Sequence, residues 1–152
     1  KPPEGNNQFS MDGVLEVRDI TGDPVPEILF HSGAAGASDS VSLEHVLRYD
    51  KSKATFIDIA PEPFYNSGTH GLRWLTVGKQ AFAVIADRNW SPRVPQEERC
   101  HYCSSPFQYS VYTWSARTNA FVVYRRVYGT ASYSTAEEAL SGDWPLVQSA
   151  TH

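Results

Sequence analysis

The stretch LRWLTVGKQAFAVIAD, residues 72–87, predicts a β-hairpin and sets the class of the fold. Its two apolar runs, 72–77 and 81–87, are rich in the aliphatic and aromatic side chains that favour strands. Only GKQ separates the two runs, and a short turn that contains glycine joins antiparallel neighbours. The sequence on either side of this hairpin continues the same alternation of strand and turn.

Further segments on both sides have the composition of strands. Two pairs of them are separated only by the short polar turns KSK and ARTN, which predicts two more hairpins. Near the end of the chain, Ser134 precedes Glu137 in a capping box and Gly142 marks a stop, so we expect one short helix over 135–141. The further strands are expected at 14–19, 27–32, 41–50, 54–60, 108–115 and 120–128.

Two of the hairpins match at a constant offset, which indicates a weak internal repeat. Three pairs of positions share an offset of 65 residues: Val46 with Val111, Tyr49 with Trp114, and Phe56 with Phe121. Upstream, VLEVRD and FAVIAD each end in an aspartate, at an offset of 68. Chance similarity between any two hairpins is the alternative interpretation.

The expected fold is therefore mostly β. A chain of 152 residues suits one domain, here 10–152 after a flexible tail at 1–9. A closed propeller needs about four blades or more, and this chain supplies about two, with candidate units at 14–60 and 72–128. We expect two small antiparallel sheets, or an incomplete propeller-like arrangement of about two four-stranded units, with one short C-terminal helix.

Charge and hydropathy narrow the range of partners. The net charge is −4, without a long block of either sign, which argues against nucleic acid or an anionic membrane as the ligand. No apolar run approaches the roughly 18 residues that span a bilayer. Removal of a signal peptide or lipoprotein leader, or trimming of a longer chain, would leave a polar, proline-rich start such as KPPEGNNQ. We expect a periplasmic or secreted bacterial protein.

The segment DITGDPVPEILF, residues 19–30, resembles the loop of the FG-GAP and VCBS-type repeats of integrin-like β-propellers. The resemblance extends mainly over 14–60. It implies a weak Ca²⁺ site, formed by the side chains of Asp19, Thr21, Asp23 and Glu27 with the carbonyl of Val25; no other cofactor is expected. The alternative is a simple turn, in which aspartate and threonine side chains hydrogen-bond to backbone N–H groups of their own loop.

Cys100 and Cys103 form a C-x-x-C pair within a long irregular stretch. The sequence after them, SSPFQYSVYTW, predicts a loop and then a strand, whereas the thioredoxin-like motif opens a helix. A zinc site would need a ligand beyond Cys100, His101 and Cys103, for which His70 is the distant candidate. A local disulfide that staples the loop is the favoured interpretation.

The same irregular stretch carries the candidate partner surface. Arg88, Trp90 and Arg93 lie close together in it, and an aromatic side chain beside arginines is typical of a binding hot spot. The loop 66–71, with His70, is its expected neighbour. We interpret the protein as an extracytoplasmic binding module of the inhibitor or adaptor type. Its ligand would be a protein, such as a toxin or a hydrolase, or a cell-wall glycan.

Two other functions stay open. A secreted hydrolase could use Asp19, Asp23 or His70, although the sequence shows no complete constellation. Ser32 lacks a G-x-S-x-G context, and His45 falls on the apolar face of its strand, where we expect a hydrogen-bonded core residue. A structural module of a larger assembly would need exposed apolar strand edges, against which the charges of YDKSK and YRR argue.

The cysteine interpretation predicts that Cys100 and Cys103 are oxidised in the mature protein. The intact mass of unreduced protein should be lower than that of reduced protein by the hydrogens lost in the bridge. Reduction should lower the melting temperature only slightly, because the closed loop is short and the entropic gain grows with loop length. Two free thiols in protein secreted by its native route would contradict this prediction.

Overall fold

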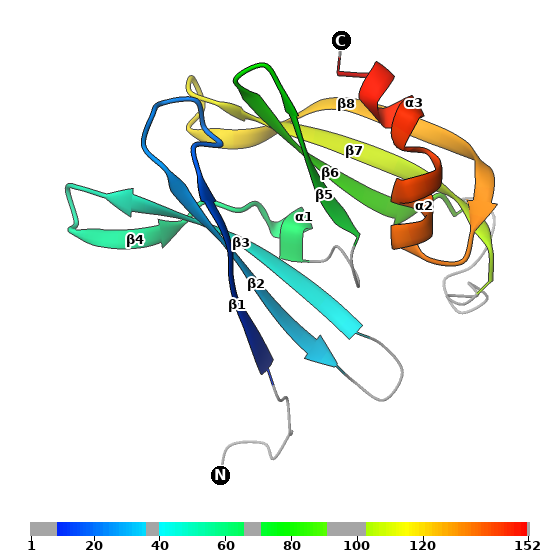
Figure 1. Ribbon diagram of the computed structural model, residues 1–152, viewed down its shortest axis with the longest axis horizontal. Coiled ribbons are helices and arrows are strands. Elements are labelled where there is room, and N and C mark those ends of the chain that lie inside the picture. Colours follow the sequence, from blue (N-terminus) through cyan, green and yellow to red (C-terminus); the bar gives the residue numbers. More distant parts are fainter. Residues whose placement is uncertain (1–8, 36–39, 66–70, 91–102, 152) are drawn as a thin grey trace.

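The computed structural model describes residues 9–35, 40–65, 71–90 and 103–151, and it is mostly β. It contains two four-stranded antiparallel sheets, in which consecutive strands lie side by side and neither sheet closes into a barrel (Figure 1). This confirms the expected fold class. Sheet A consists of β1 (Phe9–Arg18), β2 (Glu27–Ala35), β3 (Ser40–Asp50) and β4 (Thr55–Asp58), and sheet B of β5 (Leu72–Val77), β6 (Gln80–Arg88), β7 (Ser105–Ser115) and β8 (Ala120–Tyr133).

All three predicted hairpins are present. A short turn joins β5 to β6, and in it Gly78 has a φ of 61°, which glycine adopts without strain. β3 turns into β4 after Asp50, whose carboxylate accepts hydrogen bonds from the backbone N–H and the hydroxyl of Ser52. β7 turns into β8 between Ser115 and Ala120. These turns depend on local residues, which is why the sequence predicts them.

Strand β6 lies at the centre of three layers. Its residues 81–86 are all buried, because side chains of alternate residues enter two different cores. Ala81, Ala83 and Ile85 contribute to the core between the sheets, and Phe82, Val84 and Ala86 contribute to the core between sheet B and the C-terminal helices. Sheet B therefore lies between sheet A and those helices (Figure 1).

The two sheets repeat one feature at equivalent places. Tyr49 lies directly opposite Phe56 across β3 and β4, and Trp114 lies directly opposite Phe121 across β7 and β8. In both pairs the ring centroids are 5.3 Å apart and the rings meet edge to face. The upstream match is wrong, because VLEVRD lies in the first strand of sheet A whereas FAVIAD lies in the second strand of sheet B.

The prediction of a single C-terminal helix is also wrong, since two short helices end the described chain. The first, α2 (Ala136–Gly142), is the predicted one, but its N-cap is Thr135 rather than Ser134. The hydroxyl of Thr135 accepts a hydrogen bond from the backbone N–H of Glu138 at 3.1 Å. The carboxylate of Glu138 accepts one in turn from the N–H of Ser134 at 3.0 Å.

The other two helices are too short to produce a periodic signal in the sequence. α3 (Trp144–Ser149) follows α2 directly, and α1 (Glu62–Tyr65) is a single turn after β4. Helices of this length are stable only through packing, and the side chains of Val147 and Phe64 are both fully buried. No helix in the described ranges is long and apolar enough to cross a membrane.

Asp143, between α2 and α3, anchors the helices to sheet B. Its carboxylate accepts hydrogen bonds from the hydroxyls of Tyr109 at 2.8 Å and Tyr133 at 2.9 Å. Burial and the neighbouring Asp143 raise the pKa of Tyr109 well above its ordinary value, so this phenol remains a donor. Gly129 of β8 permits the approach, because a Cβ there would lie 2.2 Å from an oxygen of Asp143.

We expect Asp143→Ala to lower the free energy of unfolding by about 1–3 kcal/mol, because the hydroxyls of Tyr109 and Tyr133 both lose their carboxylate acceptor. The hydroxyl of Tyr109 keeps only the carbonyl of Ala139, at 3.1 Å. Urea denaturation measures the change. Tyr109→Phe should cost about 1 kcal/mol, the net contribution of one hydrogen bond. Tyr128→Phe is the matched control, since that side chain is 57% exposed on the same sheet. An Asp143→Ala variant as stable as the control would show that the anchor is wrong.

Candidate functional site

The loop between β1 and β2 is closed by its own side chains. Asp19 accepts a hydrogen bond from the backbone N–H of Gly22 at 2.6 Å, and Asp23 accepts one from the N–H of Val25 at 3.1 Å. Gly22 has a φ of 81°, a conformation that glycine adopts readily. Two of the predicted calcium ligands therefore cap turns of their own loop.

Glu27 is the buried centre of this loop. Its side chain is fully buried, and its carboxylate accepts hydrogen bonds from the N–H of Ile20 at 2.9 Å and the hydroxyl of Thr21 at 3.0 Å. Burial raises the pKa of Glu27 above its ordinary value, while the two hydrogen bonds act in the opposite direction. The hydroxyl of Thr21 thus donates a hydrogen bond to the carboxylate of Glu27. The turn interpretation instead expected this hydroxyl to accept a hydrogen bond from a backbone N–H of its own loop.

A guanidinium group stands where the resemblance implied a metal ion. Arg48 of β3 forms an ion pair with Asp23, and its Nη1 lies 3.9 Å from an oxygen of Glu27. The same group stacks over the ring of Trp114, 5.6 Å from its centroid, and so joins the loop to sheet B. In the described part of the chain, no group of three or more His, Cys, Asp and Glu side chains is arranged to hold a metal ion. Calcium binding stays a prediction, with Arg48 as its competitor.

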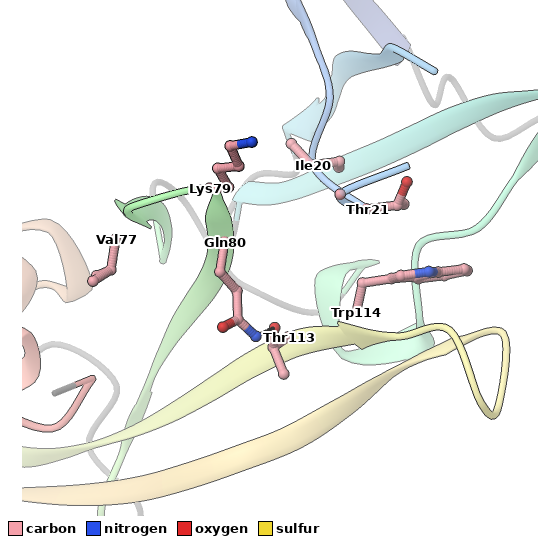
Figure 2. Close-up of a pocket in the computed structure, with 8 residues that line it drawn as sticks. Ile20, Thr21, Val77, Lys79, Gln80, Thr113 and Trp114 are labelled. Carbon is pink, nitrogen blue, oxygen red and sulfur yellow. Dashed lines mark hydrogen bonds between the residues drawn. The ribbon is translucent and has the colours of Figure 1, made fainter. Parts of the chain in front are cut away.

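A groove opens beside this loop, at the junction of the two sheets (Figure 2). Its volume is about 400 Å³. Gln80 reaches across it, and its side-chain amide donates to the hydroxyl of Thr113 at 2.9 Å. Lys79 is the charged residue of its lining, which holds no carboxylate, imidazole or thiol. This lining offers no typical set of metal ligands, and Lys79 is the side chain in it that could exchange a proton.

Arg88, predicted to bind a partner, makes internal contacts. Its guanidinium donates to the hydroxyl of Ser105 at 2.9 Å and to the carbonyls of Cys103 and Ser134. It also stacks on the rings of Phe107 and Trp90. Burial lowers the pKa of Arg88 below its ordinary value. These bonds connect β6, β7 and the start of α2, so the structure gives this arginine an architectural role. Predicted site residues outside the described ranges are His70, Arg93 and Cys100.

The outer face of sheet A, turned away from sheet B, is open and carries a set of exposed apolar side chains. Val17, Tyr49 and Phe56 are 59%, 41% and 51% exposed on it. Strand pairing places Ile28 and Leu47 in one row with Val17, between the strand edges. No described element packs over this face. Sheet B covers the inner face of sheet A, and α2 and α3 cover the far face of sheet B.

This arrangement corrects the prediction for β3. The sequence predicts His45 on the apolar face of its strand, as a core residue. His45 does share a face with Leu43, Leu47 and Tyr49, but that face is the outer one. The inner face, which enters the core, carries Val46 with no exposed surface. Because the neighbours of Val46 on the inner face, Glu44 and Arg48, are charged, the pattern in the sequence misidentifies the buried side.

Three polar side chains are hydrogen-bonded in series on the outer face. The hydroxyl of Ser32 (β2) lies 3.0 Å from Nε2 of His45 (β3), and Nδ1 of His45 lies 2.6 Å from Oδ2 of Asp58 (β4). The other oxygen of Asp58 accepts from the backbone N–H groups of Val46 at 3.2 Å and Ala60 at 2.9 Å, which fixes the carboxylate. The hydroxyl, imidazole and carboxylate are in the order found in Ser–His–Asp triads.

The chemistry of this series follows from which nitrogen holds the proton. With the carboxylate of Asp58 accepting from Nδ1, Nε2 is left as an acceptor for the hydroxyl of Ser32. Ser32 and His45 are interpreted one at a time from the sequence, and Asp58 is not among the predicted site residues. The signal that could have joined them is their equal spacing of 13 residues. Adjacent antiparallel strands bring residues at such a spacing together once the hairpin register is known.

No protein-family model, curated protein or solved structure matches the chain. The class of the protein therefore rests on its own structure, an all-β domain of two stacked antiparallel sheets with helices on one end of the stack. Membership of the FG-GAP repeats remains a prediction from the loop and strand pattern.

We expect millimolar calcium to leave the melting temperature of the native protein unchanged, because Arg48 already neutralises Asp23 and Glu27. Arg48→Met should lower the free energy of unfolding by about 2–4 kcal/mol, since it leaves the carboxylate of Glu27 buried without a countercharge. In that variant calcium should restore part of the stability. Arg125→Met, at an exposed arginine of β8, is the control. A native melting temperature that rises with calcium and falls with chelator would instead establish the cation site.

Proposed function

We propose that this domain binds another protein through the outer face of sheet A. The observation that carries the proposal is the exposure of Val17, Tyr49 and Phe56 on one sheet face that no described element covers. Ile28 and Leu47 lie in the row that joins Val17 to the strand of Tyr49. Contiguous apolar surface of this kind is typical of interaction sites. An adaptor or inhibitor in an extracytoplasmic compartment is the setting we favour, in line with the composition of the chain.

The internal repeat indicates which kind of partner surface would fit the outer face of sheet A. In each sheet the aromatic pair lies on one face, and the equivalent valine lies on the other. In sheet B the aromatic pair, Trp114 and Phe121, packs against the face of sheet A that carries Val46. By equivalence, the open pair Tyr49 and Phe56 suits a sheet with a face of the same kind.

The partner's chemistry can be stated from that contact. The face of sheet A that receives Trp114 contributes Leu29 and Val46 to the shared core, and it places Arg48 over the indole ring. We therefore expect the partner to offer an aliphatic sheet face with an arginine that stacks on Tyr49. The aliphatic row of Val17, Ile28 and Leu47 beside the aromatic pair favours a protein partner with an apolar face of its own.

Photocrosslinking tests the surface. A photoreactive phenylalanine analogue at position 56 should capture a partner protein in the native source, and the same analogue at position 128 of β8 should not. With the purified partner, Phe56→Asp should weaken binding by about 2 kcal/mol, roughly 30-fold in Kd, as expected for a central aromatic contact. Tyr128→Asp is the matched control, since Tyr128 is 57% exposed on sheet B. Equal capture from both positions, or a Kd unchanged by Phe56→Asp, would disprove the proposal.

A further inference from the structure

We propose that Ser32 is an activated nucleophile that accepts acyl groups from apolar esters, with His45 as its base and Asp58 as the positioning residue. The proposal stands on the hydrogen-bonded series Ser32–His45–Asp58 across β2, β3 and β4. It is independent of the binding proposal, because it concerns a covalent product formed by the isolated domain.

The geometry meets the requirements of nucleophile and base. The separation of 3.0 Å between the hydroxyl and Nε2 allows direct proton transfer from Ser32 to His45. The contact of 2.6 Å between Nδ1 and Asp58 holds the imidazole in the tautomer that accepts this proton and stabilises the imidazolium formed. Since Asp58 is itself fixed by two backbone N–H groups, the series is held in place at both ends.

The surroundings specify an apolar substrate. The ring of Phe30 lies 5.6 Å from that of His45, centroid to centroid, and Leu43 and Leu47 flank His45 on the same face of β3. Ser32 is 7% exposed, whereas the side chain of His45 is 24% exposed, so a substrate would reach the hydroxyl across the imidazole. An ester with a short alkyl acyl chain suits this approach.

In the proposed reaction the hydroxyl oxygen of Ser32 forms a bond to the acyl carbon and its proton passes to Nε2 of His45. The bond from the acyl carbon to the leaving oxygen then breaks, and His45 returns the proton to the departing alcohol. Water then gives a proton to Nε2 of His45 and its oxygen forms a bond to the acyl carbon. The bond from the acyl carbon to the oxygen of Ser32 breaks, His45 returns the proton to that oxygen, and the carboxylic acid leaves. Because β2 is paired on both sides, its N–H groups at Ser32 belong to the sheet ladder, so we expect activity with activated esters that need little oxyanion stabilisation.

An alkyl fluorophosphonate is the probe of choice. Its reaction forms the bond between phosphorus and the oxygen of Ser32 and releases fluoride. Intact mass should show one added phosphonyl group, and peptide mapping should place it on Ser32. Ser32→Ala should abolish labelling. Ser110→Ala, at another strand serine with 7% exposure, should leave the labelling rate unchanged.

Two more variants separate nucleophilic activation from a purely structural network. Asp58→Asn keeps an oxygen for the N–H groups of Val46 and Ala60 but places an amide NH₂ group beside Nδ1. Nδ1–H then has no acceptor, so the tautomer with an unprotonated Nε2 is no longer favoured. This variant and His45→Gln should slow labelling by about 10²- to 10⁴-fold, the usual contribution of a general base. Circular dichroism and melting temperature confirm that each variant is folded.

The same variants should slow the release of nitrophenol from p-nitrophenyl butyrate. The proposal is overturned if the native protein is labelled no faster than Ser32→Ala, or if a folded Asp58→Asn variant reacts at the native rate. Either result leaves the binding proposal intact, and failure to find a partner leaves the nucleophile untouched, so the two tests fail separately.

Discussion

The burial of residues 81–86 of β6 is the constraint on which the rest of the structure depends. Because its residues 81–86 have no solvent face, each side of sheet B must be covered, one by sheet A and the other by α2 and α3. The same strand thus requires both sheet A and the helices, because each of them covers one face of sheet B and neither can cover both faces. Asp143 and Gly129 hold the helices against sheet B. The aromatic cluster of Phe64, Trp74 and Phe121 fills the core between the two sheets.

Two arginines of sheet A add cation–π contacts to the otherwise apolar interface between the sheets. Arg18 stacks on Trp74 and Arg48 on Trp114, each 5.6 Å from the ring centroid. Arg48 also pairs with carboxylates of the loop between β1 and β2, so the loop conformation and the sheet contact are coupled through one side chain. A loop that resembles a metal site in sequence is here part of the joint between the layers. Removing a cation of this kind costs more than its net contribution to stability, because the carboxylates remain behind and that of Glu27 is fully buried.

Much of the fold could be predicted from the sequence, for reasons that differ between elements. The hairpins follow from turn residues such as Gly78, and α2 from its capping box, because these signals are local. The buried side of β3 could not be predicted, since its inner face carries Glu44 and Arg48 and its outer face carries the leucines. The link between Ser32, His45 and Asp58 depends on the register of three strands, which is set by packing rather than by neighbouring residues. The short helices depend on burial of single side chains, for which a local pattern holds no information.

The equivalence of the two aromatic pairs has a consequence for assembly. In sheet B the aromatic face meets a different face of sheet A, so the contact is heterologous: the joining surfaces are complementary and not identical. Heterologous joints propagate in one direction, and here the helices end the series on the side of sheet B. A partner sheet bound at Tyr49 and Phe56 would therefore extend the stack of sheets only at the end formed by sheet A. The stack would extend further only if the far face of the added sheet also carried an open aromatic pair.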